Sequence, residues 1–140
     1  MYVADYNNHR IQRFPPGSNI GITVAGFNLA SGPSRSELYQ PAAITVNANG
    51  QMFIVDSFNY RVLKWQLNDP LGVVIAGGRG LGSTLDKLAR CYALFVDSQS
   101  NVYVSDYGNS RVTRWLNGNT TSGILVLYLF SLSHSFTIFL

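Results

Sequence analysis

The stretch DYNNHRIQRF, from Asp5 to Phe14, returns twice in this chain of 140 residues, as DSFNYRVLKW (Asp56–Trp65) and as DYGNSRVTRW (Asp106–Trp115). The shared pattern is Asp-x-x-Asn-x-Arg-(Ile/Val)-x-(Arg/Lys)-aromatic, and successive copies start about 50 residues apart. A fixed period of this length is typical of architectures in which one supersecondary unit is repeated and stacked. The recurrence therefore indicates either a site used three times or a folding unit used three times.

The repeat extends beyond these ten residues. GITVAG at 21–26 recurs as GVVIAG at 72–77, and a third copy starts at Gly123. LYQPAAITVN at 38–47 recurs as LARCYALFVD at 88–97. We therefore expect one repeat segment over 1–126, followed by a hydrophobic tail over 127–140 whose role is unclear. The repeat units cover about 1–26, 41–77 and 92–127.

Each unit predicts short strands and tight turns. The segments are rich in β-branched and aromatic residues, and clusters of Asn, Gly, Ser and Pro separate them. Runs such as 93–96 are apolar throughout, which is typical of strands covered on both faces. We expect four strands per unit, with the first strand of the first unit missing. The predicted strands are 2–5, 10–14 and 21–25, then 42–47, 52–56, 61–65 and 72–76, then 93–97, 102–106, 111–115 and 123–127.

Helical signals are weak and lie between the units. Ser34-x-x-Glu37 and Ser83-x-x-Asp86 resemble capping boxes, in which two polar side chains satisfy the first amides of a helix. Both fall in the long connection between one predicted unit and the next. We expect each of them to form a single helical turn in a loop.

The composition agrees with an all-β fold. Only 12% of the residues are charged, roughly half the usual share of about 25%. The chain has 13 glycines, eight tyrosines and eight phenylalanines, which suits many short strands better than a helical bundle. The net charge of +3 permits an acidic partner without requiring one. A single cysteine, Cys91, excludes an internal disulfide.

The last residues, ILVLYLFSLSHSFTIFL at 124–140, carry no charge. Their number approaches the roughly 20 residues that span a bilayer as a helix. Ser131, Ser133, His134 and Ser135 interrupt the apolar run, and no basic residue follows it. The pattern favours a strand and a truncated end over a membrane anchor, so a membrane partner is expected only if this tail inserts.

The repeat resembles the NHL family, whose name comes from an Asn-His-Leu tripeptide. Asn8-His9-Arg10 keeps its first two letters, and the (Tyr/Phe)-(Val/Ile)-x-Asp-x-x-Asn-x-Arg-(Val/Ile) core and the x-Val-Ala-Gly strand match over residues 1–126. Two positions depart from the pattern, because Cys91 stands where the second unit has Pro41 and Ser100 stands where it has Gly50.

The resemblance implies a β-propeller, which closes with about four to eight four-stranded blades. The chain is then an NHL-type β-propeller segment of about three blades, the first incomplete. We expect a fragment of a larger propeller. The alternative is self-association of copies through the open blade faces. Some members of the family bind proteins and others bind RNA.

The repeated polar residues predict a structural hairpin. Asp closes one predicted strand and Arg opens the next, so the two should pair across a tight turn. Asn lies in that turn, where it tolerates left-handed backbone angles. We expect these charges to be satisfied by each other and not by a metal. The pairs are Asp5/Arg10, Asp56/Arg61 and Asp106/Arg111, and the turn residues are Asn8, Asn59 and Asn109.

Residues for catalysis are sparse. His9 and His134 are the only histidines, and their spacing is not that of metal ligands. Cys91 lies in an apolar run without a nearby histidine, which predicts a buried thiol and not a nucleophile. We therefore predict no enzyme and no cofactor. A remnant of a propeller hydrolase or lyase remains a third hypothesis.

Function is expected at the loops. The two kinds of connection that leave one end of each unit would carry aromatic side chains among basic ones, a combination that suits an acidic peptide or single-stranded RNA. We predict a non-catalytic scaffold that presents these loops to a protein partner, with RNA binding as the alternative. Asn119-Thr120-Thr121 is also a glycosylation sequon. The candidate binding residues are Tyr6, His9, Arg35, Phe58, Tyr60, Arg79, Arg90 and Tyr107.

Overall fold

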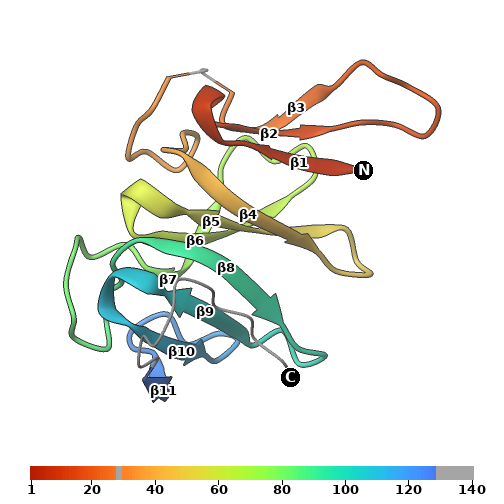
Figure 1. The fold of residues 1–140 in the computed structure, drawn as a ribbon. Coiled ribbons are helices and arrows are strands. Elements are labelled where there is room, and N and C mark those ends of the chain that lie inside the picture. The colour runs from red at the N-terminus through yellow and green to blue at the C-terminus, as the bar shows by residue number, and fades with distance from the viewer. Residues whose placement is uncertain (28–29, 129–140) are drawn as a thin grey trace.

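The computed structural model describes residues 1–27 and 30–128, and over these residues the chain is all-β. Its strands form three antiparallel sheets that stack one upon the next (Figure 1). The order of the sheets follows the order of the chain, with the N-terminal sheet at one end of the stack. The prediction of an all-β chain built from repeated sheets is confirmed.

The three sheets correspond to the three repeat units. The first sheet has three strands, as expected, and the other two have four each. Three observed strands have the predicted bounds, and the others differ from the predicted ranges by one or two residues at their ends. The first sheet contains β1 (Tyr2–Asp5), β2 (Arg10–Arg13) and β3 (Ile22–Ala25); the second contains β4 (Pro41–Val46), β5 (Gln51–Asp56), β6 (Arg61–Gln66) and β7 (Val73–Gly77); the third contains β8 (Cys91–Val96), β9 (Val102–Asp106), β10 (Arg111–Trp115) and β11 (Ile124–Tyr128).

Each repeated decamer forms a hairpin whose turn is one short 3₁₀ helix: η1 (Tyr6–Asn8), η2 (Ser57–Asn59) and η3 (Tyr107–Asn109). Asn lies in each turn, as expected, but it does not itself take the left-handed conformation. The next residue takes it, with φ of 55° at His9, 53° at Tyr60 and 50° at Ser110. The side chain of Asn is held by the Asp that precedes the turn, so the chain reverses one residue later.

The long connections contain turns but no helix among the described residues. In the first connection the amide of Glu37 donates to the carbonyl of Ser34 over 3.2 Å, and the amide of Ser34 donates to Oε2 of Glu37 over 3.2 Å. This is one half of a capping box, closed on a single turn. In the second connection the turn lies one residue later than predicted, because the amide of Lys87 donates to the carbonyl of Thr84.

The second sheet is buried on both faces. Alternate residues of a strand point to opposite faces, so Met52 and Ile54 of β5 face the first sheet while Phe53 and Val55 face the third. Fully burying one large apolar side chain contributes about 1.5–3 kcal/mol relative to leaving it exposed. The core between the first two sheets contains Ile11, Val24, Ala25, Leu38, Met52, Ile54, Leu63 and Trp65. The core between the last two contains Phe53, Val55, Val62, Ala76, Leu88, Cys91, Val102, Val104 and Trp115.

The ends of the stack are open. Over the described residues the sheets form a stack and do not close into a ring. All five residues of β11 are exposed. The predicted tail over 127–140 lies outside the described residues from 129 onward, so its expected strand is seen only as far as Tyr128. Within the described residues, no helix has the length and hydropathy needed to cross a membrane.

Candidate functional site at the hairpin end

The repeated Asp, Asn and Arg form one polar cluster in each sheet. Asp and Arg are directly paired in the β-ladder, so their side chains meet beside the turn. Nε of Arg donates to Oδ2 of Asp over 2.8, 2.7 and 2.8 Å in the three sheets. We call these the first cluster (Asp5, Asn8, Arg10), the second cluster (Asp56, Asn59, Arg61) and the third cluster (Asp106, Asn109, Arg111).

The second cluster also binds the main chain of the long connection between β3 and β4. Nη1 of Arg61 donates to the carbonyl of Pro33 over 2.7 Å, and Nη2 donates to the carbonyls of Ser34 and Glu37 over 2.8 and 3.1 Å. Nδ2 of Asn59 and Oδ1 of Asp56 bind the same loop, at the carbonyl of Gly32 and the amide of Tyr39. The cluster therefore fixes the loop through its backbone.

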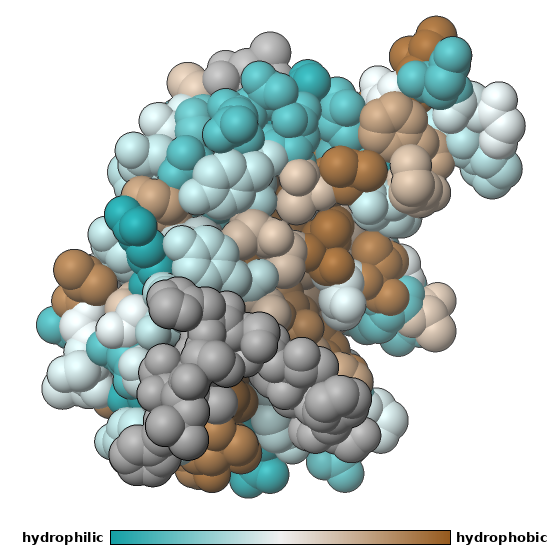
Figure 2. All heavy atoms as spheres, in the orientation of Figure 1, coloured by the Kyte–Doolittle hydropathy of each residue, from teal (hydrophilic) through white to brown (hydrophobic). Residues whose placement is uncertain are grey.

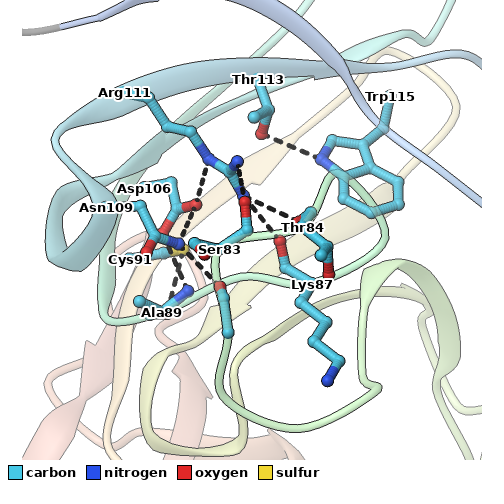
Figure 3. A network of polar contacts seen from close by, with 11 residues as sticks. Ser83, Thr84, Lys87, Ala89, Cys91, Asp106, Asn109, Arg111, Thr113 and Trp115 are labelled. Carbon is cyan, nitrogen blue, oxygen red and sulfur yellow. Dashed lines mark hydrogen bonds and ion pairs between the residues drawn. The ribbon is translucent and has the colours of Figure 1, made fainter.

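The third cluster repeats this arrangement on the loop between β7 and β8 (Figure 3). Arg111 donates through Nη1 to the carbonyl of Ser83 over 2.6 Å and through Nη2 to the carbonyls of Thr84 and Lys87 over 3.1 and 2.9 Å. Asn109 donates to the carbonyl of Gly82, and Asp106 accepts from the amide of Ala89. The sequence separations of these five contacts match those of the second cluster.

Burial separates the first cluster from the other two. Asp56 and Asp106 have no exposed side-chain area, whereas Asp5 and Arg10 are each 24% exposed. Burial raises the pKa of Asp56, although the charge of Arg61 and the hydrogen bonds from Tyr39 and Asn59 oppose the shift. At Asp5 partial burial works in the same direction, but Arg10 and Asn8 outweigh it and lower the pKa.

Cys91 lies beside the third cluster and is buried. Its thiol donates to the carbonyl of Ala89 over 3.4 Å. Burial, and after it the charge of Asp106, raise the pKa of this thiol well above its ordinary value. A thiolate is the reactive form of cysteine, so this residue fills space in the core and is unsuited to nucleophilic chemistry.

The residues that vary between repeats meet on the surface above the clusters. The ring of His9 lies 5.5 Å from that of Tyr39, Tyr39 lies 5.2 Å from Phe58, and Cζ of Arg90 lies 4.4 Å from the centre of Phe58. We call these four residues the aromatic strip. It runs from the first hairpin, past the loop before β4 and the turn η2, to the loop that enters the third sheet. In the view of Figure 2, hydrophilic residues predominate on the left side, where the hairpin turns lie, and apolar ones gather right of centre.

Backbone contacts hold the strip in place. The amide of Gln40 donates to Nδ1 of His9 over 3.2 Å. The amide of Phe58 donates to the carbonyl of Tyr39, and that of Gly108 donates to the carbonyl of Arg90. These hydrogen bonds join each hairpin to the loop beside it, so they hold in place the backbone from which the strip side chains project.

The structure brings some of the predicted binding residues together and separates others. His9, Phe58 and Arg90 are in the strip, and the ring of Tyr107 lies 5.4 Å from that of Tyr92. Tyr60 is half-buried against the core between the second and third sheets. The remaining predicted positions lie apart from the strip contacts: half-buried Tyr6 in η1, exposed Arg35 in the first long loop and exposed Arg79 in the second.

Sequence reasoning missed Tyr92, which it assigned to no surface. The register of β8 against β9 shifts between Cys91 and Ala93, and this bulge leaves Tyr92 exposed beside Tyr107. The equivalent residue in the second sheet is Ala42, also at a bulge, so an aromatic residue replacing a small one was the available signal.

Metal sites and pockets are the remaining kinds of candidate site. Among residues 1–27 and 30–128, no group of three or more His, Cys, Asp and Glu side chains is placed to hold a metal ion. An open pocket of about 360 Å³ lies between the outer strand of the first sheet and the turn after β6. Its lining is mainly apolar, with Ile22, Val24, Phe27 and Leu67.

No protein-family model and no curated protein matches the chain. Forty-seven chains of solved structures match its fold. One is a structural genomics protein of unknown function from Bacteroides thetaiotaomicron VPI-5482, with a TM-score of 0.67 and 19% sequence identity. The match covers 82% of this chain and 32% of that one, so this chain spans about a third of its neighbour's length. At this identity the likeness concerns the fold alone.

Proposed function

We propose that the chain is an NHL-type β-propeller segment that acts as a non-catalytic binding module and presents the aromatic strip to a protein partner. Three observations support the propeller: the period of about 50 residues, the stack of three repeated sheets, and the fold shared with a longer protein. A crystal structure in which β1, β4 and β8 converge toward one axis would support this architecture. A stack of sheets without a common axis would contradict it.

The observation that carries the binding function is that repeated and unrepeated side chains have different roles at the hairpin end. The repeated side chains of the second and third clusters make hydrogen bonds within the molecule. The unrepeated side chains form a chain of contacts from the first hairpin to the loop before β8. Aromatic residues and arginine are enriched where protein interfaces concentrate their binding energy.

A partner with acidic and apolar side chains suits this surface. Arg90 lies over Phe58 with its charge at the edge of the strip, and it is exposed to solvent. A cation held over an aromatic ring stays available to a carboxylate and loses little freedom on binding, because its position is already fixed. Tyr39 and Phe58 offer flat apolar area beside it.

The test is selection of peptides from a random library by the purified chain. We expect enriched peptides to bind Phe58→Ala and Arg90→Ala at least about tenfold more weakly, the effect of losing one residue at the centre of an interface. The control is Tyr128→Ala, which removes an exposed aromatic side chain from β11. No enrichment, or equal binding to all four proteins, would contradict the proposal.

RNA is the second candidate, and the stack of Arg90 on Phe58 is the observation that favours it. Stacked aromatic and guanidinium planes are surfaces on which unpaired bases also stack. Binding of a labelled 20-nucleotide single strand would weaken steeply with added salt and would be lost in Arg90→Ala. Absence of RNA binding at low salt would remove this candidate and leave the protein partner.

A further inference from the structure

The repeated decamer carries a second basic residue, at its ninth position, that the hairpin clusters do not use. It is Arg13 in the first sheet, Lys64 in the second and Arg114 in the third, and all three are half-buried. Alternate residues of a strand share a face, so Arg13 lies on the face of β2 that carries Ile11 of the core between the first two sheets. In the same way, Lys64 shares a face of β6 with Val62 of the core between the last two. The first two of these cations therefore lie between neighbouring sheets.

Pockets lie beside Arg13 and Lys64, at equivalent places in the two pairs of sheets. Each is lined by the basic residue, by the outer strand of the same sheet and by the turn after the third strand of the next sheet. Each also includes the bulge residue of that outer strand, which is Val24 in β3 and Ile75 in β7. The outer strand is an edge strand in both sheets. The pocket is thus a recurrent feature of the way one sheet packs on the next.

The two pockets differ in size. The one between the second and third sheets holds about 10 Å³, whereas the one between the first and second holds about 360 Å³. Trp115 lines the small pocket, but its counterpart Trp65 is not among the described residues that line the large one. Nε1 of Trp115 donates to Oγ1 of Thr113 over 3.1 Å, whereas that of Trp65 donates to the carbonyl of Asp69 over 2.8 Å. Leu63 stands where the third sheet has Thr113 and offers no acceptor, so the two tryptophans take different partners.

The guanidinium of Arg13 lacks a partner in the part of the chain that the structure describes. Its Nε is buried without a hydrogen-bond acceptor, and no carboxylate is placed to form an ion pair with it. A buried donor that has lost water and gained no acceptor is destabilising, and more so when it is charged. Buried polar groups in native proteins are nearly always paired, so this atom points to a species that enters the pocket.

The rest of the lining suits an apolar body. The apolar side chains are Ile22, Val24, Phe27 and Leu67. Arg13 is the one charged residue among the described residues of the lining. Ligand pockets have volumes of about 300–1,000 Å³, mainly apolar walls and a few polar groups that fix the orientation of the ligand. The pocket beside Arg13 has these properties, and its volume is at the lower end of the range.

We propose that this pocket binds a small amphipathic carboxylate, with the acid group on Arg13 and the apolar body along β3 and the turn after β6. A planar guanidinium donates two parallel hydrogen bonds to a carboxylate, which makes arginine selective for this group. One of these bonds satisfies Nε, the donor that has no acceptor in the described protein. The equivalent pocket beside Lys64 has room for roughly one water molecule, so we expect one ligand per chain.

The pocket is separate from the aromatic strip. β6 begins at the hairpin turn η2 and ends at the turn that lines the pocket, so the two sites lie at opposite ends of the strand. They share no residue. A change that abolishes carboxylate binding should therefore leave peptide binding at the strip intact, and the two proposals can fail independently.

The probe is octanoate, titrated into the full chain by isothermal titration calorimetry. We expect saturation at one molecule per chain. Octanol has the same apolar chain without the charge, and acetate has the charge without the chain. Each should bind at least about tenfold more weakly than octanoate, because each lacks one half of the recognition. Equal binding of octanol and octanoate would overturn the proposal, since the cation would then play no part.

A variant of the basic residue tests its role directly. Arg13→Gln removes the charge and should weaken octanoate binding at least about tenfold. Arg114→Gln is the matched control, because Nε of Arg114 is also buried without an acceptor, but Arg114 does not line the pocket. This control should bind octanoate as the wild type does. Arg13→Lys keeps the charge and should retain part of the affinity, which distinguishes loss of charge from loss of folding.

Nuclear magnetic resonance locates the ligand. The amide signals of residues 22–24 and 67–68 should shift when octanoate is added, whereas those of η2 should not. Binding of several molecules per chain, or equal binding by Arg13→Gln, would identify unspecific adsorption to exposed apolar residues and would overturn the proposal. So would the absence of saturation at millimolar octanoate, which would leave water as the partner of Arg13.

Discussion

Three arginines in identical sequence contexts have different energetic roles. Arg61 and Arg111 are buried and each satisfy a buried carboxylate and three carbonyls. Arg10 makes the same ion pair in a partly exposed site. Removing one member of a buried ion pair leaves its partner charged and unsolvated, whereas an exposed pair contributes little.

We expect Arg61→Ala to lower the free energy of unfolding by about 3–5 kcal/mol, because Asp56 and the loop carbonyls lose their partner. Arg10→Ala, the matched change in the partly exposed first cluster, should cost no more than about 1 kcal/mol. Urea denaturation followed through the buried Trp65 and Trp115 measures both. Equal losses would show that burial does not distinguish the clusters.

Asp97 is one carboxylate that makes stability depend on pH. Asp97 accepts hydrogen bonds from the amides of Gln99 and Asn101 and from Nδ2 of Asn101. Slight burial acts against them, but these bonds hold its pKa below the ordinary value of 3.8. The stability they give is therefore present above pH 3.8 and is lost as the pH falls through the lowered pKa.

Asp97→Asn should remove this dependence and keep the turn, because Asn47 already makes the same backbone contacts in the second sheet. Between pH 6 and pH 3, the wild type should lose more unfolding free energy than Asp97→Asn. The reverse change, Asn47→Asp, should increase the loss. Parallel pH profiles for all three proteins would rule out this carboxylate as the cause.

Much of the residue pattern could be predicted from the sequence, because a repeated Asp and Arg five residues apart have few roles besides pairing. The loop contacts of Arg61 and Arg111 could not. Their acceptors are backbone carbonyls, which every residue carries, so no side-chain signal marks them. Asn was placed in the turn because it tolerates left-handed angles. In the structure its side chain binds Asp, and the residue after it is the left-handed one.

At the scale of elements, strand positions followed from composition, while strand starts depended on bulges. β4 and β8 begin earlier than predicted, at Pro41 and Cys91, because a register shift allows one more pair with the aspartate of the hairpin. The outer strand of the second sheet ends in Gly77, whose φ of 63° lies in the left-handed region. A Cβ at this glycine would meet the carbonyl oxygen of Tyr60.

Gly77→Ala should therefore destabilise the protein more than Gly80→Ala. Both residues have positive φ, which costs about 1–2 kcal/mol for a residue with a Cβ. A Cβ at Gly80 would have no neighbour within 4 Å, so the difference reports the contacts of a Cβ at Gly77 with the carbonyl oxygen of Tyr60 and the side chain of Leu88. Guanidinium denaturation of both variants measures it. A similar loss in both would show that the backbone of Tyr60 moves aside without cost.

At the scale of the molecule, the middle sheet has a neighbouring sheet on each face, whereas each outer sheet has one face without a neighbour. On the third sheet Phe95, paired with Tyr103 at a ring distance of 6.0 Å, is 43% exposed, and Ile124 and Leu127 are exposed as well. Exposed apolar residues on the outer face of a sheet can mark interaction surfaces or sites of association. Open faces on the two outer sheets were expected from the sequence, because it contains three repeat units and only the middle one has a neighbour on each side.

We expect the chain to self-associate as its concentration rises, and Phe95→Lys to reduce this tendency by placing a charge in the apolar face. Gln99→Lys adds the same charge in the exposed turn after β8 and serves as the control. Sedimentation velocity across a hundredfold range of concentration measures the effect. A wild type that stays monomeric throughout would contradict the expectation.

The order along the chain of the loops bound by the second and third clusters has a consequence for biosynthesis. Each loop precedes the arginine that binds it, by 24 to 28 residues in both complete sheets. A ribosome therefore releases the loop before the hairpin that locks it, and no later segment is needed to form the cluster. The second cluster can form on a nascent chain soon after Gln66 has left the exit tunnel, and protease protection of stalled chains would time this event. During synthesis from the N-terminus, each new sheet can then pack against a sheet whose cluster has already formed.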